Sequence, residues 1–269
     1  MESASQSSPM PTDTLAPQGS PTGKLLAAPV SPTHAPVGPH LLPTSPAPGP
    51  IALADRPWQR KDREWNALRP LGVYARHLRY PMLYLLTVLM ALPAIVVSLP
   101  VVLMNCLLYG PSKVFFTQER VGHRGRIYII YKFRTMLDSD GRSDDARVTW
   151  FGRLLRNSHL DELPQLMNVL RGDMALIGPR PEMVSIEHWA GHFIPGFSER
   201  LILRPGLTGL AQITQGYAFD GDEDAYCQKE AYNRAYLRSV CFLGDLLILV
   251  QTPIWMLRRR GWSWTGKNG

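Results

Sequence analysis

Two adjacent carboxylates, Asp161 and Glu162, are the residues of this chain best suited to chemistry. Pro164 follows them, and proline is tolerated only in the first turn of a helix, so we expect Asp161 to cap a helix that Glu162 begins. A helix N-terminus stabilises negative charge and would keep Asp161 ionised. Such a carboxylate can attack phosphorus, while its neighbour holds a divalent cation. The alternative is that Asp161 serves only as a cap.

Basic residues crowd the same part of the sequence. Those nearest to the acidic pair are Lys132, Arg134, Arg147, Arg153, Arg156, Arg171 and Arg180. Arginine forks match phosphate oxygens and stabilise charge that develops on a transferring phosphoryl group. The pattern therefore favours phosphorylated substrates. The alternative is a solvated basic face, or one that attracts anionic lipid.

The elements that hold this chemistry include an uncharged run of 33 residues, from Tyr80 to Ser112. One bilayer crossing takes about 20 apolar residues, and two crossings take about 40 plus a turn, so the run fits neither. Pro93 and Pro100 stand near its middle, where each removes a backbone donor. We therefore expect a helix–break–helix that dips into one leaflet and returns. The alternative is one kinked transmembrane helix.

Charge supports a cytoplasmic membrane surface. Arg76 and Arg79 precede the apolar run and Lys113 follows it, which favours placing both ends on the cytoplasmic side. The net charge is +7 and the pI is about 9.5, which suits nucleic acid, anionic lipid or phosphorylated small molecules. The uncharged run favours lipid, and no motif that reads nucleic acid is present.

The chain divides into four expected segments. Half of its 24 prolines lie in the first 50 residues, which contain no aromatic residue, so we expect this part to be disordered. Trp58 and Trp65 follow in a basic stretch and suit a membrane interface. The four segments are a disordered Pro-rich segment (1–55), a basic juxtamembrane segment (56–79), the membrane helix (80–112) and a cytosolic catalytic domain (113–263).

The catalytic segment carries its own signals of secondary structure. Two β-branched and aromatic runs flank a turn at Gly122 to Arg126 and predict a hairpin. Helical patterns cover 161–170, with Gly172 as a stop, and roughly 224–237. Residues 243–257 are apolar but too few to cross a bilayer, so we expect a helix at the interface. The predicted fold is mixed α/β and mostly helical, with a short β-hairpin, a re-entrant helix–break–helix and interfacial amphipathic helices.

Five blocks of the sequence resemble the bacterial sugar transferases that prime surface glycans. They are Phe116–Gly122, Tyr131–Met136, Arg147–Thr149, Leu155–Pro181 and Arg204–Ile213. The likeness covers about residues 76–260 and points to a monotopic polyprenyl-phosphate phosphoglycosyl transferase. It implies transfer of a sugar-1-phosphate from a nucleotide diphosphate sugar, usually a UDP-sugar, to undecaprenyl phosphate with release of UMP. This step primes exopolysaccharide, O-antigen, capsule or glycoprotein glycan on the cytoplasmic face of the bacterial inner membrane.

The resemblance also implies roles for individual residues. Asp161 would be the nucleophile of an aspartyl-phosphosugar intermediate. Glu162 would assist it or bind Mg²⁺, the implied cofactor, together with Asp161. The implied phosphate ligands are Arg180, Lys132, Arg134, Arg156 and Arg204, and the candidates for the helix break are Pro93 and Pro100. A non-catalytic membrane scaffold that recruits glycan-assembly enzymes is the alternative function.

Overall fold

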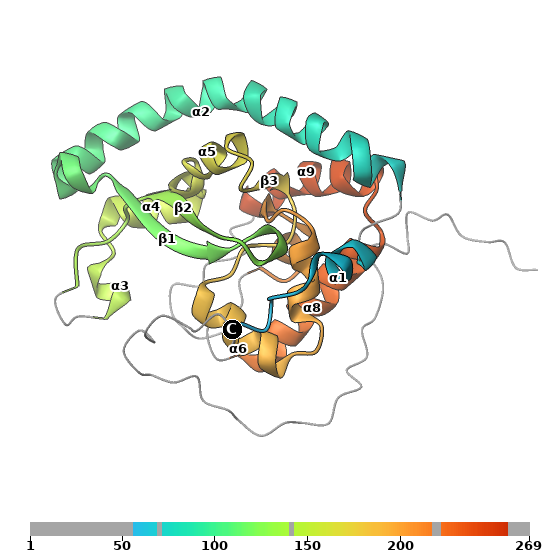
Figure 1. Cartoon of the computed structure of the whole chain (residues 1–269). Coiled ribbons are helices and arrows are strands. Elements are labelled where there is room, and N and C mark those ends of the chain that lie inside the picture. Colours follow the sequence, from blue (N-terminus) through green and yellow to red (C-terminus); the bar gives the residue numbers. More distant parts are fainter. Residues whose placement is uncertain (1–55, 69–71, 140–142, 217–221, 258–269) are drawn as a thin grey trace, which may run out of the picture. The chain divides into compact units, whose positions relative to one another are not determined.

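The computed structural model describes residues 56–68, 72–139, 143–216 and 222–257 (Figure 1). The segment expected to be disordered, 1–55, lies outside the described residues. The α-helices are α1 (Asp62–Ala67), α2 (Arg79–Tyr109), α3 (Asp144–Arg147), α4 (Trp150–Ser158), α5 (Gln165–Leu170), α6 (Val184–Phe193), α7 (Leu210–Thr214), α8 (Glu223–Arg238) and α9 (Phe242–Leu257). The strands are β1 (Phe115–Val121), β2 (Ile127–Phe133), β3 (Ala175–Ile177) and β4 (Gly206–Thr208). The described part is thus mostly helical with little sheet, as predicted.

Short helical turns of other types join these elements. A π-turn, η2, precedes α2, and the remaining turns are 3₁₀. Their bounds are η2 (Tyr74–Leu78), η3 (Pro111–Lys113), η4 (His123–Gly125), η5 (Leu160–Glu162) and η6 (Phe197–Ile202).

Strands β1 and β2 form the predicted hairpin. They pair antiparallel, with Phe115 opposite Phe133 and Val121 opposite Ile127. The turn between them includes Gly125 at φ 78°, a left-handed conformation that glycine adopts without strain. The β-branched and aromatic residues of both strands suit a pleated, half-buried ribbon, and this explains why the prediction is confirmed.

Strands β3 and β4 form a second, parallel pair, with Ala175 opposite Gly206 and Ile177 opposite Thr208. The turn that follows β3 packs backbone against backbone on the turn that enters β4 and on the residue that follows β4. A Cβ on Gly206 would lie 2.0 Å from the Gly178 nitrogen, and one on Gly209 would lie 2.1 Å from the Gly178 oxygen. Only glycine fits such a close approach, so the two turns form one rigid unit.

Helix α2 contradicts the predicted break. It runs without interruption from Arg79 to Tyr109, with Pro93 and Pro100 inside it, and it curves over the hairpin, α5 and α9 (Figure 1). A proline removes one hydrogen bond and bends a helix, but the hydrogen bonds on either side can carry the helix past it. Among the described helices, the apolar stretch Tyr74–Tyr109 alone is long and apolar enough to cross a membrane.

The two ends of α2 bury side chains in the protein, whereas most side chains of its middle face outward. Leu83 and Thr87 are buried near the start, and Val101 and Asn105 are buried near the end. Between them lies a run of large apolar side chains that face outward, among them Leu92, which is 71% exposed. The middle of α2 therefore forms an apolar arch whose outward side the rest of the described chain does not cover, while Ala94 on its inner side packs against the core.

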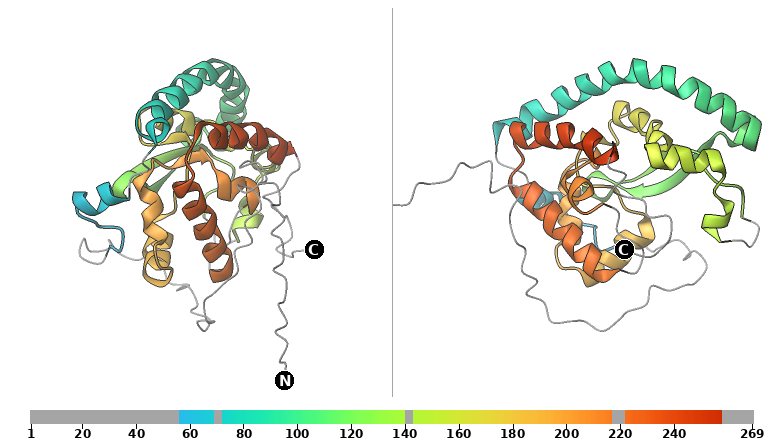
Figure 2. Two further views of the ribbon diagram at one scale, coloured as in Figure 1. Left: turned by 90° about the vertical axis from the view of Figure 1, so that its right-hand side faces the viewer. Right: turned by 180° about the vertical axis from the view of Figure 1, so that it is seen from behind.

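Helices α8 and α9 match their predicted ranges closely. The Asp222 side chain caps α8 by accepting a hydrogen bond of 2.9 Å from the Ala225 nitrogen. Helix α8 runs toward the start of α2, where Tyr236 bonds Arg79, and α9 then lies beneath α2 (Figure 2). Ile248 of α9 packs in the same core cluster as Leu83 of α2. Other apolar side chains of α9, including Leu243, are exposed, and the placement of this helix at a membrane interface stays a prediction.

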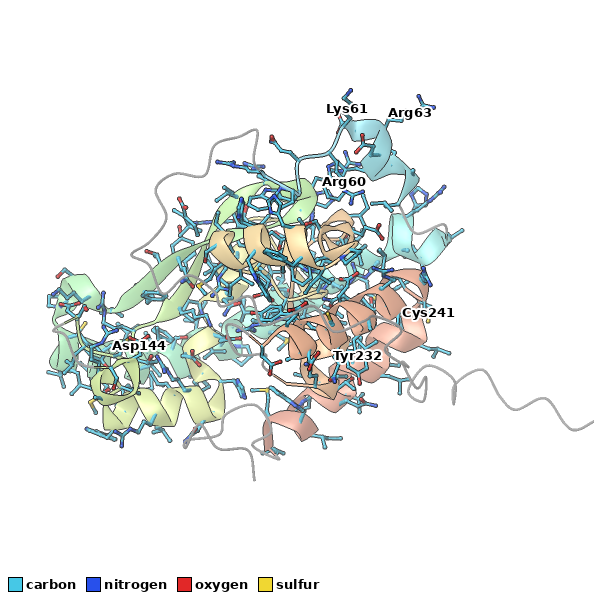
Figure 3. The ribbon with its side chains drawn as sticks, turned by 90° about the horizontal axis from the view of Figure 1, so that it is seen from below. Arg60, Lys61, Arg63, Asp144, Tyr232 and Cys241 are labelled. Atoms are coloured by element: carbon cyan, nitrogen blue, oxygen red, sulfur yellow. The ribbon has the colours of Figure 1, made fainter. Side chains whose placement is uncertain are left out.

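The tryptophans before α2 correct another prediction. Trp58 and Trp65 are only 1% and 2% exposed, so they lie in the core and not at a membrane interface. The turn at Gly125 is so close to Trp58 that a Cβ there would lie 2.5 Å from the indole. Lys61 and Arg63 of the same segment project outward at the edge of the molecule (Figure 3). The large apolar rings gain more from burial in the core than the charged residues would, so the segment packs inward through its tryptophans.

Candidate active site

The acidic pair lies in η5, between α4 and α5, and not at the start of a helix as predicted. The nitrogen of Glu162 donates to the His159 oxygen, and the nitrogen of Leu163 donates to the Leu160 oxygen. Pro164 has no N–H with which to continue an α-helix from Leu160, so the chain tightens into a 3₁₀ turn. Helix α5 begins only at Gln165, and η5 has no side-chain cap hydrogen bond.

Glu162 is held by two cations that come from distant parts of the chain. Lys132 of β2 places its Nζ 2.7 Å from Oε1 of Glu162. Arg180, in the turn after β3, places Nη2 2.5 Å from Oε1 and Nη1 3.3 Å from Oε2. Burial alone would raise the pKa of Glu162, but the charges of Arg180 and Lys132 outweigh it and hold that pKa well below its usual range. Glu162 is therefore a carboxylate at neutral pH.

Asp161 has a different electrostatic environment. It is 8% exposed, and burial together with the charge of Glu162 raises its pKa to about 6. Lys132, Arg156 and Arg180 act in the opposite direction and limit this rise. The charge on Asp161 is thus maintained at neutral pH by neighbouring cations and not by a helix N-terminus, which corrects the reason that we expected. A buried, partly desolvated carboxylate is a stronger nucleophile than a hydrated one.

Three of the five predicted phosphate ligands act on the acidic pair. Lys132 and Arg180 touch Glu162, and Arg156 of α4 adds its charge at Asp161. The Nε of Arg156 donates to Thr135 Oγ1 at 2.9 Å, which fixes the orientation of its guanidinium. These three cations come from β2, α4 and the turn after β3. The fold thus brings together side chains that span 49 positions of the sequence, from Lys132 to Arg180.

The other two predicted ligands have different partners. The guanidinium of Arg134 donates to the Lys113 carbonyl at 2.9 Å and to Asp138 at 2.8 Å. The guanidinium of Arg204 lies over the Tyr80 ring, 4.9 Å from its centroid. The described contacts of Arg134 and Arg204 therefore support local structure, and their role as phosphate ligands stays a prediction.

Two further residues belong to this region although the sequence did not mark them. Arg120 of β1 donates from Nη1 to the Pro181 carbonyl at 3.1 Å and so supports the turn that carries Arg180. His159 precedes the acidic pair with φ 56°, and its ring centroid lies 5.2 Å from that of Trp255 at the end of α9. Burial lowers the pKa of His159. Both residues lie inside or beside the quoted blocks, but no spacing rule singles them out.

The carboxylates fit a metal only in combination with substrate. The described residues contain no cluster of three or more His, Cys, Asp or Glu side chains that could hold an ion. Mg²⁺ is commonly bound through one or two carboxylates together with substrate phosphates, and Asp161 and Glu162 provide that number. The donor set is therefore compatible with Mg²⁺ bound to a diphosphate.

Comparison with known sequences decides the family. The sequence model described as "Bacterial sugar transferase" matches residues 79–259. The chain belongs to this family. All the blocks that carried the resemblance lie within the matched range, including the acidic pair and its three cations. Residues 56–78, which contain the two buried tryptophans and the π-turn, precede the matched range.

Several curated relatives of this sugar transferase have named activities. It is 38% identical over 175 residues to an Aeromonas hydrophila protein named UDP-N-acetylgalactosamine-undecaprenyl-phosphate N-acetylgalactosaminephosphotransferase; the match covers 61% of this chain and 41% of the relative. It is 40% identical over 153 residues to a Caulobacter vibrioides protein named UDP-glucose:undecaprenyl-phosphate glucose-1-phosphate transferase, covering 54% of this chain and 57% of the relative. The chain thus spans about half the length of these two relatives.

Proposed function

We propose that this sugar transferase passes a sugar-1-phosphate from a UDP-sugar to undecaprenyl phosphate. The observation that carries the proposal is the buried Asp161–Glu162 pair among Lys132, Arg156 and Arg180, in a chain of this family. The names of the relatives supply the class of donor and acceptor. Those names differ in the sugar, so the proposal covers the reaction and not one particular sugar.

In the first step, a carboxylate oxygen of Asp161 attacks the phosphorus that bears the sugar. A P–O bond forms at Asp161, the pyrophosphate P–O bond breaks, and UMP leaves with that bonding pair. In the second step, a phosphate oxygen of undecaprenyl phosphate attacks the same phosphorus and the Asp161 carboxylate is released. Splitting the transfer in this way replaces one difficult displacement by two easier ones. A pKa of about 6 leaves Asp161 ionised for the first step at neutral pH.

Lys132, Arg156 and Arg180 stabilise negative charge in both steps. Negative charge develops on the phosphoryl oxygens as the leaving group departs, and fixed cations in a buried site stabilise it strongly. Glu162 holds Arg180 and Lys132 beside Asp161 before substrate binds, so both cations are already in the site when the phosphate arrives. Glu162 thereby acts as a positioning group for both cations.

Magnesium fits the same site as a proposed cofactor. Glu162 and Asp161 would hold the ion together with the substrate diphosphate, and the bound ion would neutralise charge on the pyrophosphate. Lys132 and Arg180 now occupy both oxygens of Glu162. Binding of a diphosphate would give these two cations new anionic partners and leave Glu162 oxygens for the metal.

We also propose that α2 dips into one leaflet of the bacterial inner membrane and returns to the cytoplasmic face. What supports this is that Arg79 and Asn105, about 40 Å apart along the helix, both bond to the catalytic domain. A helix that crossed a core of about 30 Å would leave these two residues on opposite faces. The segment before α2 adds support, because Trp58 and Trp65 anchor it to the same domain.

The reaction is tested with purified protein, Mg²⁺, undecaprenyl phosphate and a panel of UDP-sugars. The wild type should release UMP with at least one donor, and peptide mass mapping should locate the sugar-phosphate adduct on Asp161. Asp161→Asn should lose both signals while it still sediments with membranes. Turnover by Asp161→Asn at the wild-type rate would refute the role of Asp161 as nucleophile, whereas a wild type that releases no UMP with any donor would favour a membrane scaffold.

The topology is tested by labelling single cysteines placed at exposed sites on either side of α2. Cysteines at Arg63 and Lys113 should both react with an impermeant maleimide only when the cytoplasmic face of the membrane is accessible. Reaction from opposite faces would refute the dip and restore a kinked crossing.

A further inference from the structure

The first turn of α2 reaches deep into the catalytic domain through Arg79. The side chain of Arg79 is completely buried. Its Nε donates to Asp245 Oδ2 at 2.9 Å, and its Nη2 donates to the Tyr236 hydroxyl at 2.7 Å and to the backbone carbonyl of Ile177 at 2.6 Å. One guanidinium thus joins the membrane helix to α8, α9 and β3.

The bond to Ile177 is the one that leads to the active site. Ile177 is the last residue of β3, and the turn that carries Arg180 begins with the next residue, Gly178. Arg180 in turn holds Glu162 at 2.5 Å. A displacement of Arg79 therefore moves the end of β3, and with it the cation that pairs with the acidic dyad.

Tyr80, the next residue of α2, makes an equivalent contact with the second turn. Its hydroxyl accepts a hydrogen bond of 3.1 Å from the Arg204 nitrogen, and the Arg204 guanidinium lies over its ring. Arg204 stands two residues before β4, which pairs with β3. Consecutive residues of α2 thus hold both strands of the parallel pair. Gly178 and Gly206 then pack the two turns together, so the displacement of one turn moves the other.

We propose that Arg79 and Tyr80 are positioning residues, which transmit the seating of α2 in the membrane to the Arg180 turn. This inference rests on the proposed function and adds a coupling between the membrane helix and the catalytic geometry. Displacing a catalytic group by about 1 Å can lower a rate about 100-fold, so a shift of α2 too small to unfold the protein would still reduce turnover.

Arg79→Lys is the principal variant. Lysine keeps a positive charge opposite Asp245 but lacks the planar fork that serves Asp245, Tyr236 and Ile177 at once. We expect kcat for UMP release to fall about ten- to hundredfold with the KM for the UDP-sugar changed less than threefold. Tyr74→Phe is the matched control, because the Tyr74 hydroxyl bonds Asp245 without reaching β3. It should keep kcat within about twofold of the wild type, as expected of a residue outside the active site.

A double-mutant cycle with Arg180→Lys separates positioning from general damage. If Arg79 acts through Arg180, then Arg79→Lys should cost less than about twofold once Arg180 is already replaced. If the two losses multiply, Arg79 does not act through Arg180 and the inference is wrong. A wild type that releases no UMP would instead defeat the proposed function itself.

Tyr80→Phe keeps the inference testable if Arg79→Lys does not fold. Phenylalanine retains the ring beneath Arg204 and removes the hydroxyl that accepts from the Arg204 nitrogen. We expect kcat to fall about three- to tenfold, as for the loss of one positioning hydrogen bond of about 1 kcal/mol. As for Arg79→Lys, we expect Tyr80→Phe to lower kcat less than about twofold once Arg180 is already replaced by lysine. A Tyr80→Phe enzyme with the turnover of the wild type would overturn the inference.

Discussion

The two ends of α2 are fixed to the catalytic domain by opposite kinds of chemistry. At its start, the charged pair of Arg79 and Asp245 is fully buried. At its far end, the neutral amide of Asn105 donates at 3.0 Å to the carbonyls of both Val114 and Arg134. A charged anchor holds the helix at one end, and an uncharged one holds it at the other.

Each end supports the element that supplies one cation to Glu162. The charged end bonds to β3, whose following turn carries Arg180. The neutral end bonds to the carbonyl of Arg134, two residues beyond Lys132 on β2. Helix α2 therefore braces both sides of the site while its exposed middle makes no such contribution. The helix that we propose to enter the membrane therefore also frames the candidate site.

Asp245→Ala should destroy the charged anchor of α2 and cause the largest loss of stability among these variants. It removes the acceptor for Arg79, Tyr74 and Tyr236 and leaves a buried guanidinium without its counter-ion. We expect a loss of about 3–5 kcal/mol in the free energy of unfolding, measured by chemical denaturation in detergent. Asp62→Ala breaks the exposed ion pair with Arg124 and is the control, with an expected loss below about 1 kcal/mol. Equal losses in the two variants would show that burial of the pair is immaterial.

Leu92→Lys should weaken membrane binding through the middle of α2 without disturbing the contacts at either end. The side chain is 71% exposed, so lysine disturbs no packing within the described protein. A charge at the centre of a bilayer costs about 2.5–3.5 kcal/mol, and we therefore expect weaker membrane retention in a flotation assay. The melting temperature in detergent should stay that of the wild type. Undiminished flotation would mean that the arch does not enter the hydrocarbon.

Asn105→Ala should show that the neutral end is the weaker anchor. Two backbone carbonyls lose their donor, which costs about 1–3 kcal/mol for buried groups. Denaturation in detergent should therefore give a smaller loss than Asp245→Ala. A loss as large as that of Asp245→Ala would remove the distinction between the two ends.

Thr87→Val should have the smallest effect although Thr87 is fully buried. Its hydroxyl donates at 2.8 Å to the Leu83 carbonyl of the same helix and makes no tether to the domain. Valine has nearly the same shape, so we expect a change of about 0.5–1.5 kcal/mol. Comparing the thermal melting of Thr87→Val with that of Asn105→Ala would show whether a hydrogen bond to the domain matters more than burial of the side chain. A loss above that of Asn105→Ala would contradict this ranking.

The local parts of the fold were predictable from sequence. The hairpin, α8 and α9 follow from short-range periodicity and turn residues, which act within a few positions. The acidic pair and the surrounding cations could also be named, because carboxylates among arginines are an unusual combination for a solvated surface, but assigning Lys132 and Arg180 as phosphate ligands took the family resemblance. What the sequence could not give was which of the many cations would converge on the pair.

The errors at Arg79 and at the two tryptophans have a long-range cause, whereas the error at the prolines is local. Arg79 beside an apolar run suggests a charge at the membrane surface, yet Asp245, 166 positions away, draws it into the interior. Trp58 and Trp65 suggest an interface, yet the hairpin turn and the core receive them. Prolines near the middle of the run suggest a break, yet α2 bends and continues. Pairing between residues that are distant in the chain leaves no periodic trace.

The contact of glycine on glycine behind Arg180 also limits how such an enzyme can diversify. Gly178, Gly206 and Gly209 approach one another with no room for even a methyl group. Saturation mutagenesis should therefore find almost no active substitutions at these three positions. Laboratory evolution toward new sugars would have to change other residues and keep these three glycines.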